Sequence, residues 1–239
     1  MRKIIIYVIA LMMLMPMTAA WAAKRQKVEP SYAWTISEPL GLHFPGTIDT
    51  LQYNYFRSVV PSLVSNAYAT TGNYGAQGQN QIFFDRQPYS DFFFEDALSA
   101  WLPTVSNQVY YNTRIPMTIM SYTFGGNRYS NQDRFQTLFS GNVNKAIQVG
   151  AAFDYLYSKG SYDAQSDKDI TWRLFGSYIG DRYEMQSFYN SYNFLTKESG
   201  GITDDRYITD PAEVQGGVTK VDTKTIPTNL TKAHSQIWG

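Results

Sequence analysis

The sequence predicts an all-β protein: a transmembrane antiparallel up-and-down β-barrel, of which this chain supplies a part, with an irregular N-terminal region. Three observations carry this prediction: one long strand with strict alternation, short and long connections that alternate along the chain, and tyrosines near the predicted strand ends. A soluble antiparallel sheet shows the same alternation within a strand, so strand length, loops and tyrosines favour the barrel.

The clearest strand covers residues 147–158, where every second side chain is apolar. A period of two is typical of a β-strand with one apolar face. At about 3.4 Å per residue and a tilt of about 45°, this strand covers roughly 28 Å, close to the thickness of a bilayer's hydrocarbon core. The strand is therefore long enough to cross a membrane.

Further strands are predicted on both sides of this one, at residues 109–113, 117–124, 133–143, 170–179 and 182–195. Tight turns are expected at 144–145 and 180–181, whereas the connections after 124, 158 and 195 look long. Outer-membrane barrels have short periplasmic turns and longer external loops, which assigns the tight turns to the periplasm. Residues 233–239 could begin another strand, so the barrel is incomplete in this chain.

The two faces of the predicted strands differ in character. Apolar side chains are expected to face lipid: Phe135, Phe139, Ile147, Val149, Phe153, Tyr155, Trp172 and Leu174. Charged side chains on the other face would line an aqueous lumen and set its charge preference: Arg134, Asp154, Arg173, Arg182 and Glu184.

The N-terminus predicts export. Arg2 and Lys3 precede an apolar run of about a dozen residues and a small-residue cleavage site ending at Ala22, which is typical of a secretory signal peptide. The chain therefore divides into a signal peptide at 1–22, an irregular segment at 23–81 and barrel strands at 82–239. The middle segment is either a periplasmic extension or a segment that folds into the lumen.

Composition excludes several other functions. The chain has no cysteine and carries 20 basic against 20 acidic residues, so thiolate chemistry and nucleic-acid binding are not expected. Only two histidines are present, which leaves little material for a catalytic triad. The acidic loop residues, such as Asp167, Asp169 and Asp204, lack the spacing of a calcium loop. We expect no catalytic residues, no cofactor and no metal.

Five short segments together resemble the putative porin family of Bacteroidetes: 113–118 (TRIPMT), 121–126 (SYTFGG), 142–145 (NVNK), 176–183 (GSYIGDRY) and 198–202 (ESGGI). In the last segment Ser199 stands where the family usually has Asn. The resemblance extends from about residue 82 onward, and family members are considerably longer. It implies an outer-membrane β-barrel of a Gram-negative bacterium.

These observations lead to one expected function and one alternative. The expected function is passive diffusion of small hydrophilic solutes through an outer-membrane porin, with outer-membrane lipid and the solutes as partners and no enzymatic step. Homo-oligomerisation is left open. The alternative is a secreted or surface β-sandwich that acts in binding or adhesion, which has the same alternation within its strands.

Overall fold

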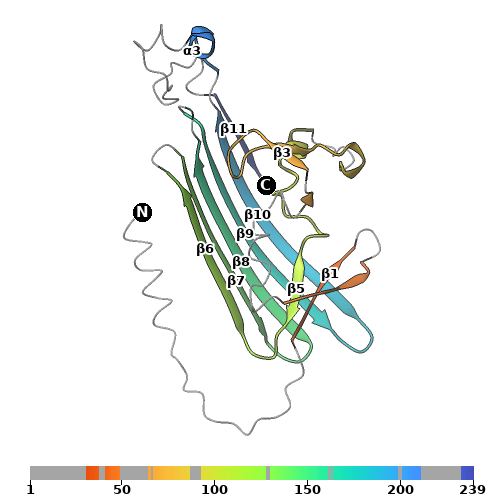
Figure 1. The fold of residues 1–239 in the computed structure, drawn as a ribbon. Coiled ribbons are helices and arrows are strands. Elements are labelled where there is room, and N and C mark those ends of the chain that lie inside the picture. Colours follow the sequence, from red (N-terminus) through yellow and green to blue (C-terminus); the bar gives the residue numbers. More distant parts are fainter. Residues whose placement is uncertain are drawn as a thin grey trace, which may run out of the picture. The chain divides into compact units, whose positions relative to one another are not determined.

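The computed structural model describes residues 31–37, 41–48, 64–65, 67–86, 93–127, 130–160, 162, 164–198, 201–210 and 233–239 (Figure 1). The predicted signal peptide at 1–22 lies outside the described residues. Ser31–Gly239 forms one compact unit.

Six antiparallel strands form the largest sheet, and each pairs with its neighbour in sequence, as the prediction of an up-and-down arrangement required (Figure 1). The strands are β6 (Met117–Gly126), β7 (Asn131–Asn142), β8 (Ile147–Lys159), β9 (Ser166–Ile179), β10 (Glu184–Glu198) and β11 (Ala233–Trp238). The predicted strand at the end of the chain is therefore present. Because β6 and β11 are the two edges of this sheet, the described residues form no closed barrel.

The connections differ from the prediction. The loop 127–130 has four residues, as many as each of the turns 143–146 and 180–183 at the other end, and the loop 160–165 has only six. The expected alternation of long and short is thus wrong for these loops, and only the connection from β10 to β11 is long. The reason is that backbone pairing continues through polar residues such as Asp167 and Lys168, which an apolar pattern does not mark.

The register sorts the side chains of the sheet onto two faces. Cross-strand pairs such as Phe153 with Trp172 belong to one face, which we call the apolar face. Its large side chains are exposed: Met120, Tyr122, Phe124, Phe139, Val149, Phe153, Trp172, Leu174, Tyr178, Met185 and Tyr189. The opposite face holds Arg134, Gln148, Asp154 and Ser177, and we call it the covered face because other parts of the chain lie on it.

The covering layer comes from the described residues of the range 31–113, which we call the N-terminal layer. These residues form a three-stranded sheet in the order β2-β1-β5, a two-stranded hairpin β3-β4 and two short 3-10 helices. Their bounds are β1 (Tyr32–Ile36), β2 (His43–Gly46), β3 (Tyr68–Thr70), β4 (Gly78–Asn80), β5 (Val109–Asn112), η2 (Phe83–Asp85) and η3 (Phe93–Leu98). β5 was predicted as a strand, but it pairs with β1 rather than with the six-stranded sheet.

Aromatic and aliphatic side chains attach this layer to the sheet at two places. The Trp34 ring stacks on Tyr110 at 5.8 Å, and the edge of Tyr110 meets Phe175 of β9 at 6.2 Å between ring centroids. Leu98 and Leu102 pack with Phe194 of β10 in a second cluster. Each large side chain buried in this way contributes about 1.5–3 kcal/mol. These contacts explain why the covered face, which is otherwise polar, also carries aromatic side chains such as Phe175 and Phe194.

The backbone also approaches the sheet closely at Gly75. This residue has φ +95°, and a Cβ added to it would lie 2.6 Å from Leu156 Cδ2 and 2.8 Å from Asp169 Oδ2. Glycine is therefore favoured here for two reasons: the backbone is in the left-handed region, and a Cβ would collide with side chains of the sheet.

Candidate functional site

Three of the five predicted lumen residues come together at the middle of the covered face. Arg134, Asp154 and Arg173 lie on the consecutive strands β7, β8 and β9. Gln136 stands directly opposite Asp154 in the register, and Arg173 stands opposite Ala152, one side-chain row away. The alternation of each strand is what brings these polar groups to a single face.

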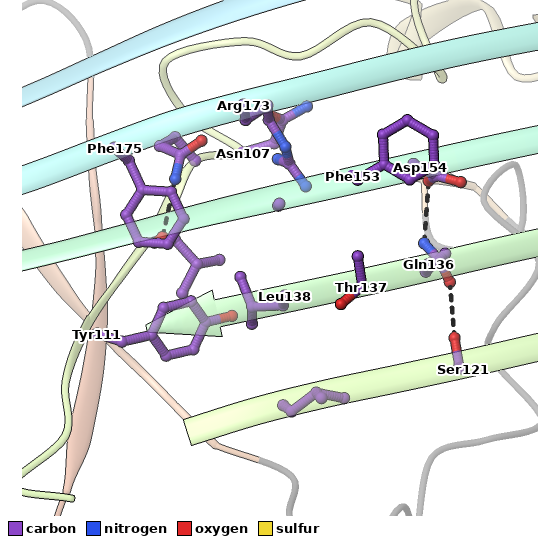
Figure 2. Close-up of a pocket in the computed structure, with 14 residues that line it drawn as sticks. Asn107, Tyr111, Ser121, Gln136, Thr137, Leu138, Phe153, Asp154, Arg173 and Phe175 are labelled. Carbon is purple, nitrogen blue, oxygen red and sulfur yellow. Dashed lines mark hydrogen bonds between the residues drawn. The ribbon is translucent and has the colours of Figure 1, made fainter. Parts of the chain in front are cut away.

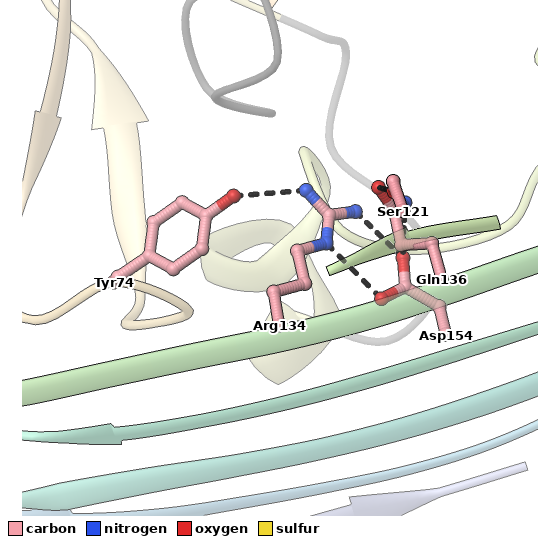
Figure 3. Close-up of polar contacts among 5 residues, drawn as sticks. All are labelled: Tyr74, Ser121, Arg134, Gln136 and Asp154. Carbon is pink, nitrogen blue, oxygen red and sulfur yellow. Dashed lines mark hydrogen bonds and ion pairs between the residues drawn. The ribbon is translucent and has the colours of Figure 1, made fainter. Parts of the chain in front are cut away.

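Arg134 and Asp154 form a bidentate ion pair (Figure 3). Arg134 Nε donates to Asp154 Oδ1 at 3.1 Å and Nη2 donates to Oδ2 at 2.6 Å. Gln136 Nε2 donates to the same Oδ2 at 3.0 Å, and Ser121 Oγ donates to Gln136 Oε1 at 3.4 Å. Both oxygens of Asp154 are thus occupied, and its charge is neutralised by Arg134.

The same arginine joins the sheet to the N-terminal layer. Its Nη1 donates to the Tyr74 hydroxyl at 2.9 Å, and its Cζ lies 5.8 Å from the centroid of the Trp101 ring. Arg134 is only 7% exposed in this arrangement. A buried arginine needs such a full set of partners, because a charge removed from water without them is strongly unfavourable.

Beside this network lies a hollow of about 250 Å³ between the covered face and residues 107–111 (Figure 2). Its polar lining comes from both parts of the molecule: Asn107, Gln108, Tyr111, Ser121, Gln136, Asp154 and Arg173. Leu138 and Phe175 supply apolar walls. The hollow therefore combines convergent polar groups with apolar walls, which is typical of a site for a small polar molecule.

The other two predicted lumen residues lie apart from this cluster. Arg182 is exposed in the turn between β9 and β10, so it is not on a strand face as expected. Glu184 starts β10, and its carboxylate lies 3.7 Å from Nε2 of His43 in the N-terminal layer. Gln186 contacts the same nitrogen at 2.8 Å. Glu184 and Gln186 thus lie at the end of the covered face that is next to the turn 180–183.

A family model described as "putative porin" matches residues 31–239. The chain belongs to the putative porin family. The match includes the N-terminal layer as well as the six-stranded sheet, so both parts are features of this porin-family chain. No curated protein and no solved structure matches the chain significantly. Within the described residues, no helix is long and apolar enough to span a membrane.

The residues predicted to face lipid all lie on the apolar face of this porin-family protein. The register pairs Phe135 with Tyr155, and Phe139 and Leu174 both with Ala151. Val149, Phe153, Trp172 and Leu174 are exposed, and Ile147 is half-buried. Contact with lipid itself stays a prediction, but the structure does bring all eight side chains to one surface.

Sequence reasoning missed two acidic residues of the covered face. Asp167 and Asp169 were assigned to an exposed loop, whereas they lie on β9 and are 1% and 5% exposed. Among the described residues, neither carboxylate oxygen of Asp169 has a hydrogen-bond partner, whereas Asp167 lies beside the polar side chains of Asn73, Ser158 and Thr196. Their i, i+2 spacing matched the period of a strand, but the absence of apolar residues around them concealed it.

Asp204, by contrast, does lie in a loop, where it pairs with Arg206 at 2.7 Å. In the described residues, no group of three potential metal ligands gathers in one place.

Proposed function

We propose that this protein is a channel in the outer membrane through which small hydrophilic solutes diffuse passively. The apolar face of the six-stranded sheet would contact lipid, and the covered face would border the aqueous lumen. In this arrangement the N-terminal layer lies inside the lumen and narrows it. The chain would perform no covalent chemistry, and export would require cleavage of the signal peptide near Ala22.

One observation carries this proposal: the sheet leaves its apolar face exposed and covers its polar face. Phe139, Val149 and Leu174 are 47%, 42% and 49% exposed, whereas Gln148 and Ser177 on the other face are 2% and 5% exposed. Water would oppose such an arrangement, because large contiguous apolar patches are rare on soluble monomers. In a bilayer the same arrangement is favourable, because lipid solvates the apolar side and the lumen hydrates the polar one.

The β-sandwich alternative predicts the opposite arrangement. Two sheets of a sandwich pack through their apolar faces, and their polar faces meet the solvent. Here the N-terminal layer packs on the face that carries Arg134 and Asp154, and no described part of the chain covers the Trp172 face. The porin interpretation accounts for both features with one assumption, the presence of a membrane.

Cell fractionation and bilayer recordings test the proposal together. We expect the full-length protein in the outer-membrane fraction, with heat-modifiable migration on electrophoresis and step-like conductance in planar bilayers. Recovery from the soluble periplasm, without any current, would reject the channel and favour the secreted sandwich. Membrane recovery without current would reject diffusion while leaving the barrel in place.

A further inference from the structure

Of the two charged side chains that line the hollow in Figure 2, Arg173 is the one without an ion pair among the described residues. Asp154 is the acidic residue of the lining, and both of its oxygens already accept hydrogen bonds from Arg134 and Gln136. Arg173 is the basic residue of the lining. Among the described residues, no carboxylate, carbonyl or hydroxyl accepts a hydrogen bond from its guanidinium. The hollow therefore has a net positive character.

Arg173 occupies a protected place in the sheet. It lies in the middle of β9, opposite Ala152 on β8, and its side chain is among those that line the hollow (Figure 2). Its side chain is half-buried between β8, β10 and the N-terminal layer. A guanidinium in such a place loses part of its hydration, so an anion that reaches it gains more than it would at the surface.

The N-terminal layer supplies a second donor. Tyr111 of β5 lines the same hollow, and its ring lies 6.1 Å from that of Phe175. Burial raises the pKa of Tyr111, while the charge of Arg173 lowers it. Since the net effect is an increase, the hydroxyl keeps its proton at neutral pH and can donate a hydrogen bond. Two donors from different parts of the chain thus face one cavity.

We propose that Arg173 and Tyr111 form a binding subsite for the oxyanion group of a small solute, such as a carboxylate or a phosphate. The planar fork of arginine matches the two oxygens of such a group. The hollow of about 250 Å³ limits the solute to a small molecule, and the apolar walls of Leu138 and Phe175 suit a short carbon chain beside the anionic group. This inference rests on the proposed channel function and assigns it a solute class.

Bilayer recordings on the full-length protein test the subsite. Channels are measured in potassium chloride, then titrated with sodium acetate or sodium phosphate at constant ionic strength, and the concentration that halves the chloride current is determined. We expect Arg173→Gln to raise this concentration roughly tenfold or more for the preferred oxyanion, and Tyr111→Phe to raise it roughly threefold. The preferred anion identifies the solute group as a carboxylate or a phosphate.

Two further variants separate the subsite from a general charge effect. Lys145→Gln removes one positive charge from the exposed turn between β7 and β8 and should leave the titration unchanged. Arg173→Lys keeps the charge but loses the planar fork, so it should retain preference for anions over cations and still bind the oxyanion more weakly. It also serves as the test if Arg173→Gln does not assemble.

The outcomes are distinct. Equal inhibition of the wild type and both Arg173 variants by the oxyanion would reject the subsite. The subsite would also be rejected if Lys145→Gln weakened oxyanion inhibition as much as Arg173→Gln does. Oxyanions that act no more strongly than chloride would also reject it. Absence of any current in the wild type would instead reject the channel function on which the subsite rests.

Discussion

The six-stranded sheet and the N-terminal layer are held by different kinds of interaction. In the sheet, neighbouring strands pair over long continuous registers, fourteen residue pairs between β9 and β10. The N-terminal layer has strands of three to five residues, and it is positioned by side chains that reach across to the sheet. Disrupting one strand contact should thus matter little in the sheet, whereas one anchoring side chain should matter greatly in the layer.

The largest effect is expected when Arg134 is replaced by Met. This change leaves the half-buried carboxylate of Asp154 without its ion-pair partner and removes the link to Tyr74, at a cost near the lower end of about 3–5 kcal/mol. Hydrogen exchange should rise in residues 67–80 and 93–102 of the N-terminal layer, with the strands β8 to β10 still protected. The double variant Arg134→Met with Asp154→Leu should recover much of the loss, because it buries no lone charge. If the single and the double variant lost exchange protection equally, the assigned role of the Arg134–Asp154 ion pair would be contradicted.

A similar loss of exchange protection in the N-terminal layer is expected when the contact between Tyr110 and Phe175 is removed. Phe175→Ala removes the ring against which Tyr110 packs, and substitutions of this kind cost about 3–5 kcal/mol. Exchange protection should fall in β1 and β5. Phe188→Ala is the matched control, since Phe188 faces Phe175 across the strands but is 36% exposed, and it should have a much smaller effect. Comparable loss of protection in the two variants would argue against the anchor.

The sheet itself should be most sensitive to charge on its apolar face. Leu174→Arg places a cation where lipid is proposed, at a cost of about 2–4 kcal/mol near the middle of a bilayer. Thr171→Arg is the control on the same strand, because Thr171 lies on the covered face directly opposite Asp154. Denaturant titration of the protein folded in lipid vesicles should show the loss for Leu174→Arg alone. Equal tolerance of both substitutions would contradict the assignment of faces.

A smaller effect of opposite sign is expected at the buried acids. The buried oxygens of Asp169 have no hydrogen-bond partner among the described residues, so Asp169→Asn should stabilise the protein by about 1 kcal/mol at neutral pH. The same titration measures this gain. Asp181→Asn, in the exposed turn before β10, should produce no change. A loss of stability in Asp169→Asn would mean that the carboxylate has a favourable role.

Most of the sheet, but little of the N-terminal layer, could be predicted from the sequence. The alternation around Phe153 and Trp172 identifies strands and faces, because a period of two needs no knowledge of distant residues. The short strands β1 to β4 have no such period, and Pro45 even lies within β2. Their pairing depends on partners far along the chain, as in Ala33 with Tyr111.

The candidate site shows the same division. Arg134, Asp154 and Arg173 could be assigned to one polar face from alternation, whereas Tyr74, Trp101 and Tyr111 enter the site only through the folding of the N-terminal layer. Asp167 and Asp169 were misassigned because burial depends on Gly75 and its neighbours, which lie about ninety residues earlier in the chain.

The sequence by itself determined the class of protein, the order of the long strands and the chemical difference between the two faces of the sheet. Each of these follows from residues within one strand or from neighbours joined by a short turn. Only the tertiary structure decided which face is covered, which charges are neutralised and where a cavity remains. Those properties depend on contacts between the N-terminal layer and strands distant in sequence, and local alternation contains no information about them.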